Sequence, residues 1–356
     1  MDNSREIKVL DDGDRQNYRD FLDQADYKDI LQSWEWGEVK SFFDWRPQRL
    51  AIINNGVKEG VVQILEKEFF FGLSILYIPR GPVIDWTDSE TIDRFLKLIR
   101  AFVRDTRTGK KSVFLRIESP AGPSEEVKGI FGKNGFKEYF KTVQPPTTLL
   151  IDLSGSQEEI FRRFRRTARN LIYRSEKEGL AIESKSGKEV TGTDLKAFYN
   201  LYKITGRRFS FPLRPLEQFR LIIEKMGKSG MLRFYTARIK GMVLAHGIVA
   251  VLGDKAFYIW GGTRRHKEYS KFFNYGYIWG MLKDLQASGI KTFDFWGLGP
   301  TDDKDHPWYG FSLFKTAFDG RRFDYLPAFD LPLSRLYSFF KVIDRIKTPK
   351  YRATSS

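Results

Sequence analysis

One order of secondary-structure elements occurs twice along this chain of 356 residues, on either side of a break at Gln144-Pro145-Pro146. Apolar periodicity and turn residues predict that each half has helices, an antiparallel hairpin or meander, a long helix and then another strand. Two consecutive prolines interrupt regular structure and mark a domain boundary. We therefore expect an α/β (α+β) protein with a first domain over 1–146 and a second over 147–319, each with a mixed sheet, and a cleft between them.

The first half contains alternating residues typical of strands and one strongly amphipathic segment. Its predicted strands are Ile7–Leu10, Leu50–Asn54, Val61–Glu68, Leu73–Pro79 and Ser112–Glu118. Its predicted helices are Gln32–Phe43 and Ser89–Asp105. The Asn-Asn-Gly between the second and third strands favours a tight hairpin turn, because these residues tolerate positive φ.

The second half follows the same plan after the prolines. Its predicted helices are Ser156–Gly179, Thr193–Lys203, Pro215–Lys225 and Phe272–Ser288. Its predicted strands are Thr147–Leu153, Leu180–Ser184, Leu232–Arg238, Met242–Val251, Ala256–Gly262 and Thr292–Phe295. A tail over Leu331–Ile346 has helix-like apolar spacing with basic residues between, which fits a helix packed on a domain or one lying on a membrane surface.

Composition removes several classes of chemistry. The chain has no cysteine and only three histidines, which excludes disulfides and thiolate catalysis and makes a metal site improbable. Its 60 Lys+Arg against 45 Asp+Glu give a formal charge of +15, which favours an anionic partner such as a nucleic acid, a phosphorylated metabolite or an acidic membrane. A basic surface kept only for solubility is the alternative.

The beginning of the chain, MDNSREIKVL, lacks the layout of a signal peptide, and no apolar run reaches 18 residues. We expect a cytoplasmic protein, with the basic tail favouring contact with the inner membrane face.

The segment Phe293–Phe318 holds a lysine in an unusual setting. A predicted strand carries Asp294, ends at Gly297 and Gly299, and leads through an acidic loop to Lys315 between aromatic residues. A lysine of this kind either packs its stem with the head in water or presents its ammonium to developing negative charge. Asp294 is expected to have a structural role at the strand end.

Other cations also adjoin aromatic residues. Lys40 lies one helical turn after Trp36, Arg207 and Arg208 end a helix, and Arg80 follows a strand at a proline turn. The guanidinium groups of Arg207 and Arg208, at a helix-to-loop transition, suit bidentate phosphate contacts. The structural alternatives are an exposed helix lysine, a favourable helix-dipole interaction and a solvated turn, respectively.

The densest positive charge lies in FRRFRRTARNLIYRSEKEG, residues 161–179. Its arginines spread over more than one helix face, so simple amphipathic packing does not account for them, whereas a nucleic-acid backbone would. A solvated helix face is the alternative. The candidate RNA-binding residues are Arg162, Arg163, Arg165, Arg166 and Arg169.

Familiar nucleotide and hydrolase motifs are missing from the sequence. It has neither a G-x-x-x-x-G-K-[ST] phosphate loop nor a G-x-S-x-G elbow. We find no Gln/Arg-x-x-Gly-x-Gly/Ala turn that would hold a coenzyme A pyrophosphate at a helix N-terminus. An ordinary acyl-CoA enzyme is therefore disfavoured.

Four stretches together resemble the FemABX family of peptidoglycan aminoacyltransferases. They are LQSWEWGEVKSFFDW, YIPRGPV, TGRRFSF, and YIWGG through FDFWGLG to GFSLFKTAFDG, in the family's order. The resemblance implies two tandem domains of the N-acetyltransferase (GNAT) type, with the tail 320–356 completing the first. It also implies catalysis without a metal or coenzyme.

The resemblance assigns roles by motif. Lys315 with Phe314 would form the catalytic pair near the acyl ester, Lys40 beside Trp36 and Arg208 (or Arg207) would contact the precursor phosphates, and Tyr258 would line the precursor site. The implied partners are an aminoacyl-tRNA and a peptidoglycan precursor, which is either lipid II or the UDP-linked precursor UDP-MurNAc-pentapeptide. The predicted function is tRNA-dependent transfer of an amino acid to the precursor's stem-peptide amine. A GNAT-fold acyltransferase with another donor or polymer, and a basic RNA-binding protein without activity, are the alternatives.

Overall fold

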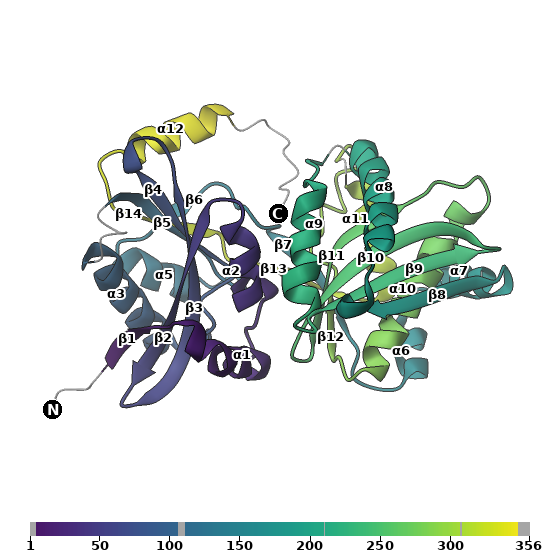
Figure 1. Ribbon diagram of the computed structural model, residues 1–356, viewed down its shortest axis with the longest axis horizontal. Coiled ribbons are helices and arrows are strands. Elements are labelled where there is room, and N and C mark those ends of the chain that lie inside the picture. Colours follow the sequence, from purple (N-terminus) through teal and green to yellow (C-terminus); the bar gives the residue numbers. More distant parts are fainter. Residues whose placement is uncertain (1–4, 106–110, 210, 307, 348–356) are drawn as a thin grey trace. The chain divides into compact units, whose positions relative to one another are not determined.

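The computed structural model describes residues 5–105, 111–209, 211–306 and 308–347 (Figure 1). The chain divides into two compact units: unit 1 comprises Met1–Pro146 with Asp324–Ser356, and unit 2 comprises Thr147–Phe323. Each unit contains a seven-stranded sheet with both parallel and antiparallel pairs. The predicted α/β fold with two mixed sheets is confirmed.

Unit 1 builds its sheet in the order β1-β2-β3-β4-β5-β14-β6, in which β4 and β5 pair in parallel. Its strands are β1 (Arg5–Val9), β2 (Trp45–Asn54), β3 (Val57–Glu68), β4 (Ser74–Pro79), β5 (Ser112–Glu118), β6 (Lys137–Tyr139) and β14 (Ala328–Pro332). Its helices are α1 (Arg15–Gln24), α2 (Trp34–Ser41), α3 (Ser89–Asp105), α5 (Glu125–Lys133) and α12 (Tyr337–Lys347). The expected hairpin joins β2 and β3 through Asn55 and Gly56, whose φ values are 50° and 78°.

Unit 2 has the sheet order β13-β7-β12-β11-β10-β9-β8, with β11 and β12 parallel. Its strands are β7 (Thr147–Asp152), β8 (Leu180–Ser186), β9 (Leu232–Ile239), β10 (Met242–Leu252), β11 (Lys255–Thr263), β12 (Thr292–Asp294) and β13 (Arg321–Asp324). Its helices are α6 (Gln157–Arg163), α7 (Arg166–Lys177), α8 (Gly192–Phe209), α9 (Leu216–Ile222), α10 (Phe273–Ala287) and α11 (Tyr309–Lys315).

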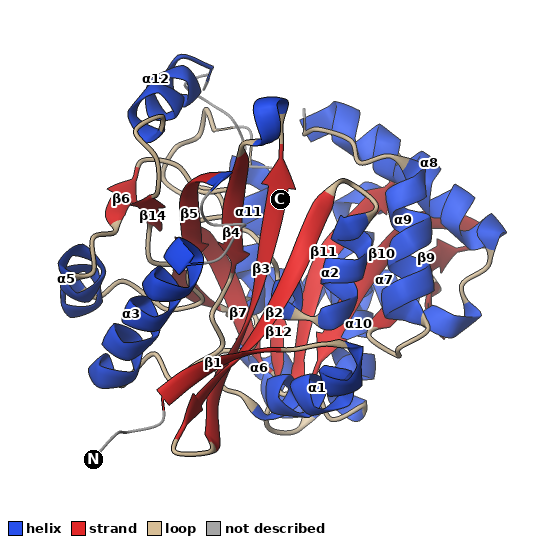
Figure 2. Cartoon of the chain, turned by 60° about the vertical axis from the view of Figure 1, so that its left-hand side comes forward, coloured by secondary structure: helices blue, strands red, loops and turns tan. Residues whose placement is uncertain are grey.

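Helices cover both faces of the second sheet (Figure 2). On β9, Phe234 packs against Phe198 of α8, whereas the next residue, Tyr235, lies in the core cluster that includes Tyr277 of α10. Successive strand residues point to opposite faces, so α8 and α10 lie on opposite sides of the sheet. This layering fixes α8 and its terminal arginines on one face.

The last strand of the chain, β14, returns to the first sheet after all the strands of unit 2. β7, which follows β6, lies between β12 and β13, and β14, which follows β13, lies between β5 and β6. Arg116 Nε and Nη2 hold the Asp330 carboxylate of β14 at 2.8 Å each, with both side chains buried. Because β13 belongs to the second sheet, the return to unit 1 begins at Asp324 rather than at residue 320. Residues 348–356 of the expected tail lie outside the described residues.

One predicted helix is broken in the structure and another is shortened. The helix expected over 156–179 is broken into α6 and α7 at Phe164 and Arg165, because Phe164 has extended backbone (ψ 148°) and its ring packs into the core beside Trp279 and Phe318. The tail helix expected from Leu331 begins only at Tyr337, since Leu331 pairs with Leu115 as part of β14. Helices α1 and α5 were not predicted.

Candidate active site

The most unusual charge in unit 2 is Lys315, the last residue of α11. Its side chain is only 2% exposed, and its Nζ donates hydrogen bonds to the carbonyl oxygens of Phe295, at 3.0 Å, and Gly297. Nζ also lies 4.1 Å from the ring centroid of Phe311. The ammonium head is therefore inside the protein, which rules out the alternative of a packed stem with the head in water.

The loop after β12 is built to present those carbonyls. Asp294, the last residue of β12, accepts hydrogen bonds from Thr148 Oγ1 at 2.5 Å and from Trp296 N at 2.8 Å. Trp296 has φ 67°, a left-handed conformation that turns the chain sharply and is costly for an aromatic residue. The N–H of Gly299 donates to Ser312 Oγ of α11 at 2.9 Å. Loop and helix thus fix each other around Lys315.

Burial sets the protonation chemistry of this lysine. Loss of water around the ammonium lowers the pKa of Lys315 to about 7, and the nearby Asp294 carboxylate opposes that shift. Asp294 is itself buried and lies 3.5 Å from Lys255 Nζ. The expected structural role of Asp294 is seen in its hydrogen bonds, and its charge also acts on Lys315.

Phe314 lies next to Lys315 in the chain but faces the core. Its ring packs edge-on against Tyr275 of α10, with centroids 4.9 Å apart, and against Phe318 at 5.4 Å. This packing holds α11 against α10, so the geometry assigns Phe314 the part of positioning Lys315.

Helix α8 brings a second cation to the same region. It extends to Phe209, beyond the predicted end at Lys203, and the Phe209 ring lies 6.0 Å from that of Phe311. Arg208 donates through Nη1 to Thr263 Oγ1 at 3.2 Å and through Nη2 to the Thr263 carbonyl at 3.1 Å. Burial, and then the neighbouring Arg265, lower the pKa of Arg208.

The structure distinguishes the two adjacent arginines by their exposure and their hydrogen bonds. Arg208 is half-buried and oriented by Thr263 at the end of β11, whereas Arg207 is exposed. A preorganised guanidinium loses less freedom on binding an anion, so Arg208 is the better candidate for a phosphate ligand.

Tyr258 lies inside unit 2, on β11. Its ring stacks on Phe293 with centroids 6.4 Å apart, and a Cβ at Gly261 would meet its hydroxyl oxygen at 2.2 Å. Burial raises the pKa of the Tyr258 phenol. The structure places this ring in the α10-side core, and its predicted contact with a precursor stays a prediction.

Unit 1 gathers a separate aromatic and cationic cluster at the C-terminal end of α2. Lys40 Nζ lies 5.4 Å from the Trp36 ring centroid and 5.5 Å from that of Trp45. Lys67 Nζ lies 6.0 Å from the Trp45 ring on the adjacent strand. The predicted pairing of Lys40 with Trp36 on one helix face is present in the structure.

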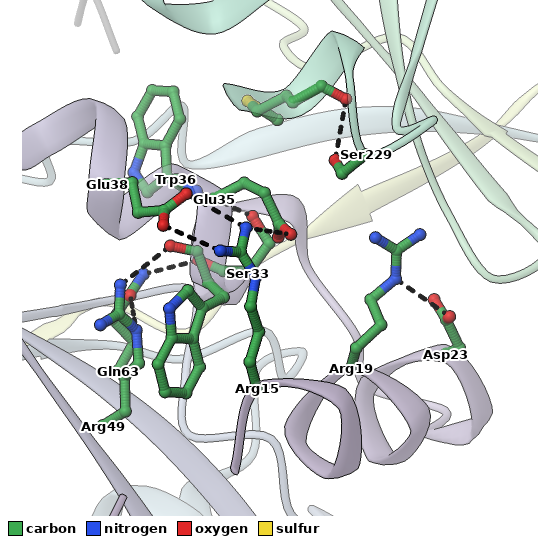
Figure 3. A network of polar contacts seen from close by, with 12 residues as sticks. Arg15, Arg19, Asp23, Ser33, Glu35, Trp36, Glu38, Arg49, Gln63 and Ser229 are labelled. Atoms are coloured by element: carbon green, nitrogen blue, oxygen red, sulfur yellow. Dashed lines mark hydrogen bonds and ion pairs between the residues drawn. The ribbon is translucent and has the colours of Figure 1, made fainter. Parts of the chain in front are cut away.

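A partly buried polar network holds α2 in place (Figure 3). Ser33 caps the helix by accepting from Trp36 N at 3.2 Å, and Arg15 spans Glu35 and Glu38 at 2.9 Å each. Arg49 donates to the Trp34 carbonyl at 2.9 Å. These contacts fix the helix that carries Trp36 and Lys40.

Arg80 is buried, so the alternative of a solvated turn residue is wrong. It is 3% exposed, has φ 47°, donates to the Pro145 carbonyl and stacks 3.4 Å above the Tyr325 ring centroid. Beside it lies Glu118, which sequence reasoning missed. Glu118 accepts from Tyr77 Oη at 3.0 Å and from the Gln144 N–H at 2.9 Å, and burial raises the pKa of its carboxyl. Its position at the end of an apolar strand was the sequence feature that could have identified Glu118.

The predicted RNA-binding arginines cluster at the corner between α6 and α7. Arg169 fastens the corner itself, donating through Nη1 to the carbonyls of Arg162 at 2.6 Å and Phe164 at 2.9 Å. Four arginines are exposed there: Arg162, Arg163, Arg165 and Arg166. Arg162 and Arg163 pair with Glu158 and Asp152, whereas the guanidinium groups of Arg165 and Arg166 have no partner among the described residues.

Comparisons with known proteins find matches in both units of the chain. The model of the FemAB family matches residues 14–124, and the model of the acetyltransferase (GNAT) domain matches residues 162–305. The lipid II:glycine glycyltransferase of Staphylococcus haemolyticus (strain JCSC1435) is 24% identical, covering 86% of this chain and 88% of its own. That of Staphylococcus aureus (strain COL) is 22% identical over the same shares.

Solved structures show the same fold. The crystal structure of FemX superposes with a TM-score of 0.81 at 20% identity, covering 94% of this chain and all of its own. A tandem GNAT protein from the clavulanic acid biosynthesis pathway superposes at 0.52 and 10% identity, covering 93% and 99%.

The two mixed sheets, the match to the acetyltransferase (GNAT) domain model and the glycyltransferase relatives define the class: the protein is a tandem GNAT-fold acyl- or aminoacyltransferase. The matches to the FemAB model and to the glycyltransferases support membership of the FemABX family.

Proposed function

We propose that this enzyme builds peptidoglycan cross-bridges by moving an amino acid from an aminoacyl-tRNA to the stem-peptide amine of lipid II. The observation that carries the proposal is Lys315, a buried cation held by two backbone carbonyls in unit 2. Residues 162–305 of the same unit match the acetyltransferase (GNAT) domain model. The names of the glycyltransferase relatives support lipid II as the acceptor. The UDP-linked precursor is the second candidate acceptor.

The proposed reaction is aminolysis of an ester. The neutral acceptor amine attacks the ester carbonyl and forms a C–N bond, and the tetrahedral oxyanion collapses with breakage of the C–O bond to the ribose. The amine proton ends on the ribose oxygen, so the products are an amide and a free hydroxyl. Protonated Lys315 would stabilise the oxyanion or the leaving oxygen, an effect worth about 3 kcal/mol for one oxyanion donor.

Among the described residues of the acidic loop, no aspartate is placed as a base. Asp303 Oδ1 accepts the backbone N–H of Asp305 at 3.0 Å, which is a loop-stabilising contact, and Asp302 and Asp305 are exposed. We therefore assign the proton transfer to the substrates or to water, and much of the acceleration to orientation of an already activated ester.

The donor is expected to bind at the α6–α7 corner. Helix α7 has no side-chain cap and no acid in its first turn, so its free N–H groups and Arg165 and Arg166 present positive charge together. Replacing Arg165 and Arg166 with glutamine should weaken tRNA binding and reduce its dependence on salt, because each lost phosphate contact lowers the slope by about one. Lys188→Gln and Lys291→Gln, also on unit 2, are the controls. An unchanged salt slope would place the tRNA elsewhere.

The deciding experiment combines the purified chain with charged tRNA, one amino acid at a time, and either lipid II or the UDP-linked precursor. We expect transfer from at least one charged tRNA. Transfer from an acyl-CoA with none from any charged tRNA would favour an acyltransferase with another donor. Tight tRNA binding without transfer to any acceptor would favour the RNA-binding protein.

A further inference from the structure

Helix α12 of unit 1 has apolar residues on two faces. Its inner face packs on Phe114, whose ring lies 5.7 Å from Tyr337 and 5.0 Å from Phe340. Leu336 just before the helix and Phe339 and Val342 within it follow a spacing of three and are 45%, 67% and 55% exposed. Packing on unit 1 therefore accounts for only half of the apolar residues of this segment.

The turn between β3 and β4 adds another exposed ring at the same place. Phe71 is fully exposed although its φ of 62° is strained for a phenylalanine, so the fold gains nothing from the ring. Phe69 and Leu73, on either side, pack on the same small cluster as Phe340. Figures 1 and 2 both show α12 at the end of the unit 1 sheet toward which β3 runs.

Positive charge surrounds these apolar residues. Arg335 and Arg345 are exposed on α12 and its approach, and a Cβ at Gly72 would lie 3.7 Å from Lys111 Nζ. The acid of the helix, Asp344, is turned to Tyr139 Oη at 2.8 Å and Lys141 Nζ at 3.0 Å. The outer surface of the segment thus combines apolar side chains with cations and no described acid of its own.

We propose that this surface, termed the docking face, binds an anionic lipid bilayer. It consists of Phe71, Leu336, Phe339 and Val342 with Lys111, Arg335 and Arg345. Apolar side chains enter the boundary between headgroups and acyl chains, and the cations meet lipid phosphates. A second copy fits less well, because self-pairing would set cations against cations.

The helix would lie on the membrane rather than cross it. α12 has 11 residues, about half of what a bilayer requires. Within the described ranges, no helix combines the length and apolarity of a membrane span. The inference does not depend on the proposed transfer reaction, although a lipid-linked acceptor would be reached from the same surface.

The test is flotation of the full chain with phosphatidylglycerol vesicles and with phosphatidylcholine vesicles. We expect binding to the anionic vesicles only, weakened by salt. Phe71→Ser and Phe339→Ser should each lower the partition coefficient on the order of tenfold, because each removes a ring that the bilayer would bury. Arg335→Gln and Arg345→Gln should each lower it about fivefold. Val57→Ser, a 65% exposed apolar residue at the opposite end of β3, is the matched control and should bind as the wild type does.

Several results would overturn the docking face. They are no flotation of the wild type, flotation of Phe339→Ser equal to that of the wild type, or Phe339-dependent dimers in sedimentation. All variants change exposed side chains, and circular dichroism and thermal melting check that they fold. Transfer to the soluble UDP-linked acceptor should be unchanged in Phe71→Ser and Phe339→Ser. Flotation needs no substrate, so a failure of this inference is distinguishable from a failure of the proposed function.

Discussion

One strand in each unit, β5 in unit 1 and β12 in unit 2, ends at a buried acid, but the cation beside that acid differs between the units. β5 ends at Glu118 and β12 ends at Asp294, each about 1% exposed, and each acid has a buried cation nearby. In unit 1 the cation is Arg80, stacked on Tyr325 and bonded to the Pro145 carbonyl. In unit 2 it is Lys315, bonded to the carbonyls of Phe295 and Gly297.

The difference between the two cations is chemical. A guanidinium keeps its proton in any protein environment, so Arg80 offers a permanent charge and suits a structural role at the end of unit 1. An ammonium responds to burial, and the pKa of Lys315 is lowered to about 7. The same fold thus holds a permanently charged arginine beside Glu118 in unit 1 and a lysine with a lowered pKa in unit 2.

The largest expected effect is a loss of activity when the buried cation of unit 2 is replaced. Lys315→Met should lower kcat by about 10²–10³-fold, because it removes the charge offered to the oxyanion. Steady-state transfer measures this, with Lys291→Met, a 71% exposed lysine of unit 2, as the control. Turnover near that of the wild type would remove Lys315 from the mechanism.

Glu118→Gln should instead act on stability. The amide keeps one acceptor oxygen where the carboxylate accepts from Tyr77, Val143 and Gln144, and it leaves Arg80 without its neighbouring charge. We expect a loss of about 2–3 kcal/mol in the free energy of unfolding, with kcat per folded molecule unchanged. Urea unfolding beside Glu138→Gln, an exposed acid of unit 1, measures it. An equal loss of unfolding free energy in Glu118→Gln and Glu138→Gln would contradict a structural role for Glu118.

Stability and activity should respond to pH in opposite directions through Lys315. Between pH 7 and 10 the unfolded chain holds the lysine proton and the folded chain does not, so the wild type gains stability as pH rises. The gain relative to Lys315→Met is at most about 1.4 kcal/mol per pH unit. Transfer that needs the ammonium falls over the same window. Unfolding of both proteins at pH 7 and 9 measures the difference, and a constant gap would exclude the lowered pKa.

The smallest effect concerns the acid beside the lysine. The Asp294 charge raises the pKa of Lys315 against the effect of burial, so Asp294→Asn should move the alkaline limb of the pH–rate profile to lower pH. A shift of one unit would lower single-turnover transfer at pH 8 by up to about tenfold. Asp254→Asn, on the turn before β11, serves as control. A limb at unchanged pH would assign Asp294 a structural role alone.

Local patterns determined the parts of this protein that depend on neighbours in sequence. The period-two and period-3.6 spacing of apolar residues located most strands and long helices, and Asn-Gly located the β2–β3 turn. The aromatic setting of Lys315 and the pairing of Lys40 with Trp36 were visible because they lie within one or two turns of the chain.

Tertiary structure decided what depends on distant partners. Leu331 forms a strand rather than a helix because β5, more than 200 residues earlier, accepts it as a neighbour and Arg116 binds Asp330. Phe164 breaks a basic helix because its ring is buried against Trp279 and Phe318. Residue type gave Lys315 and Arg80 their charge, but only the fold removed water from them. Because of this burial, Arg80 serves as a structural anchor, whereas Lys315 becomes a titratable group.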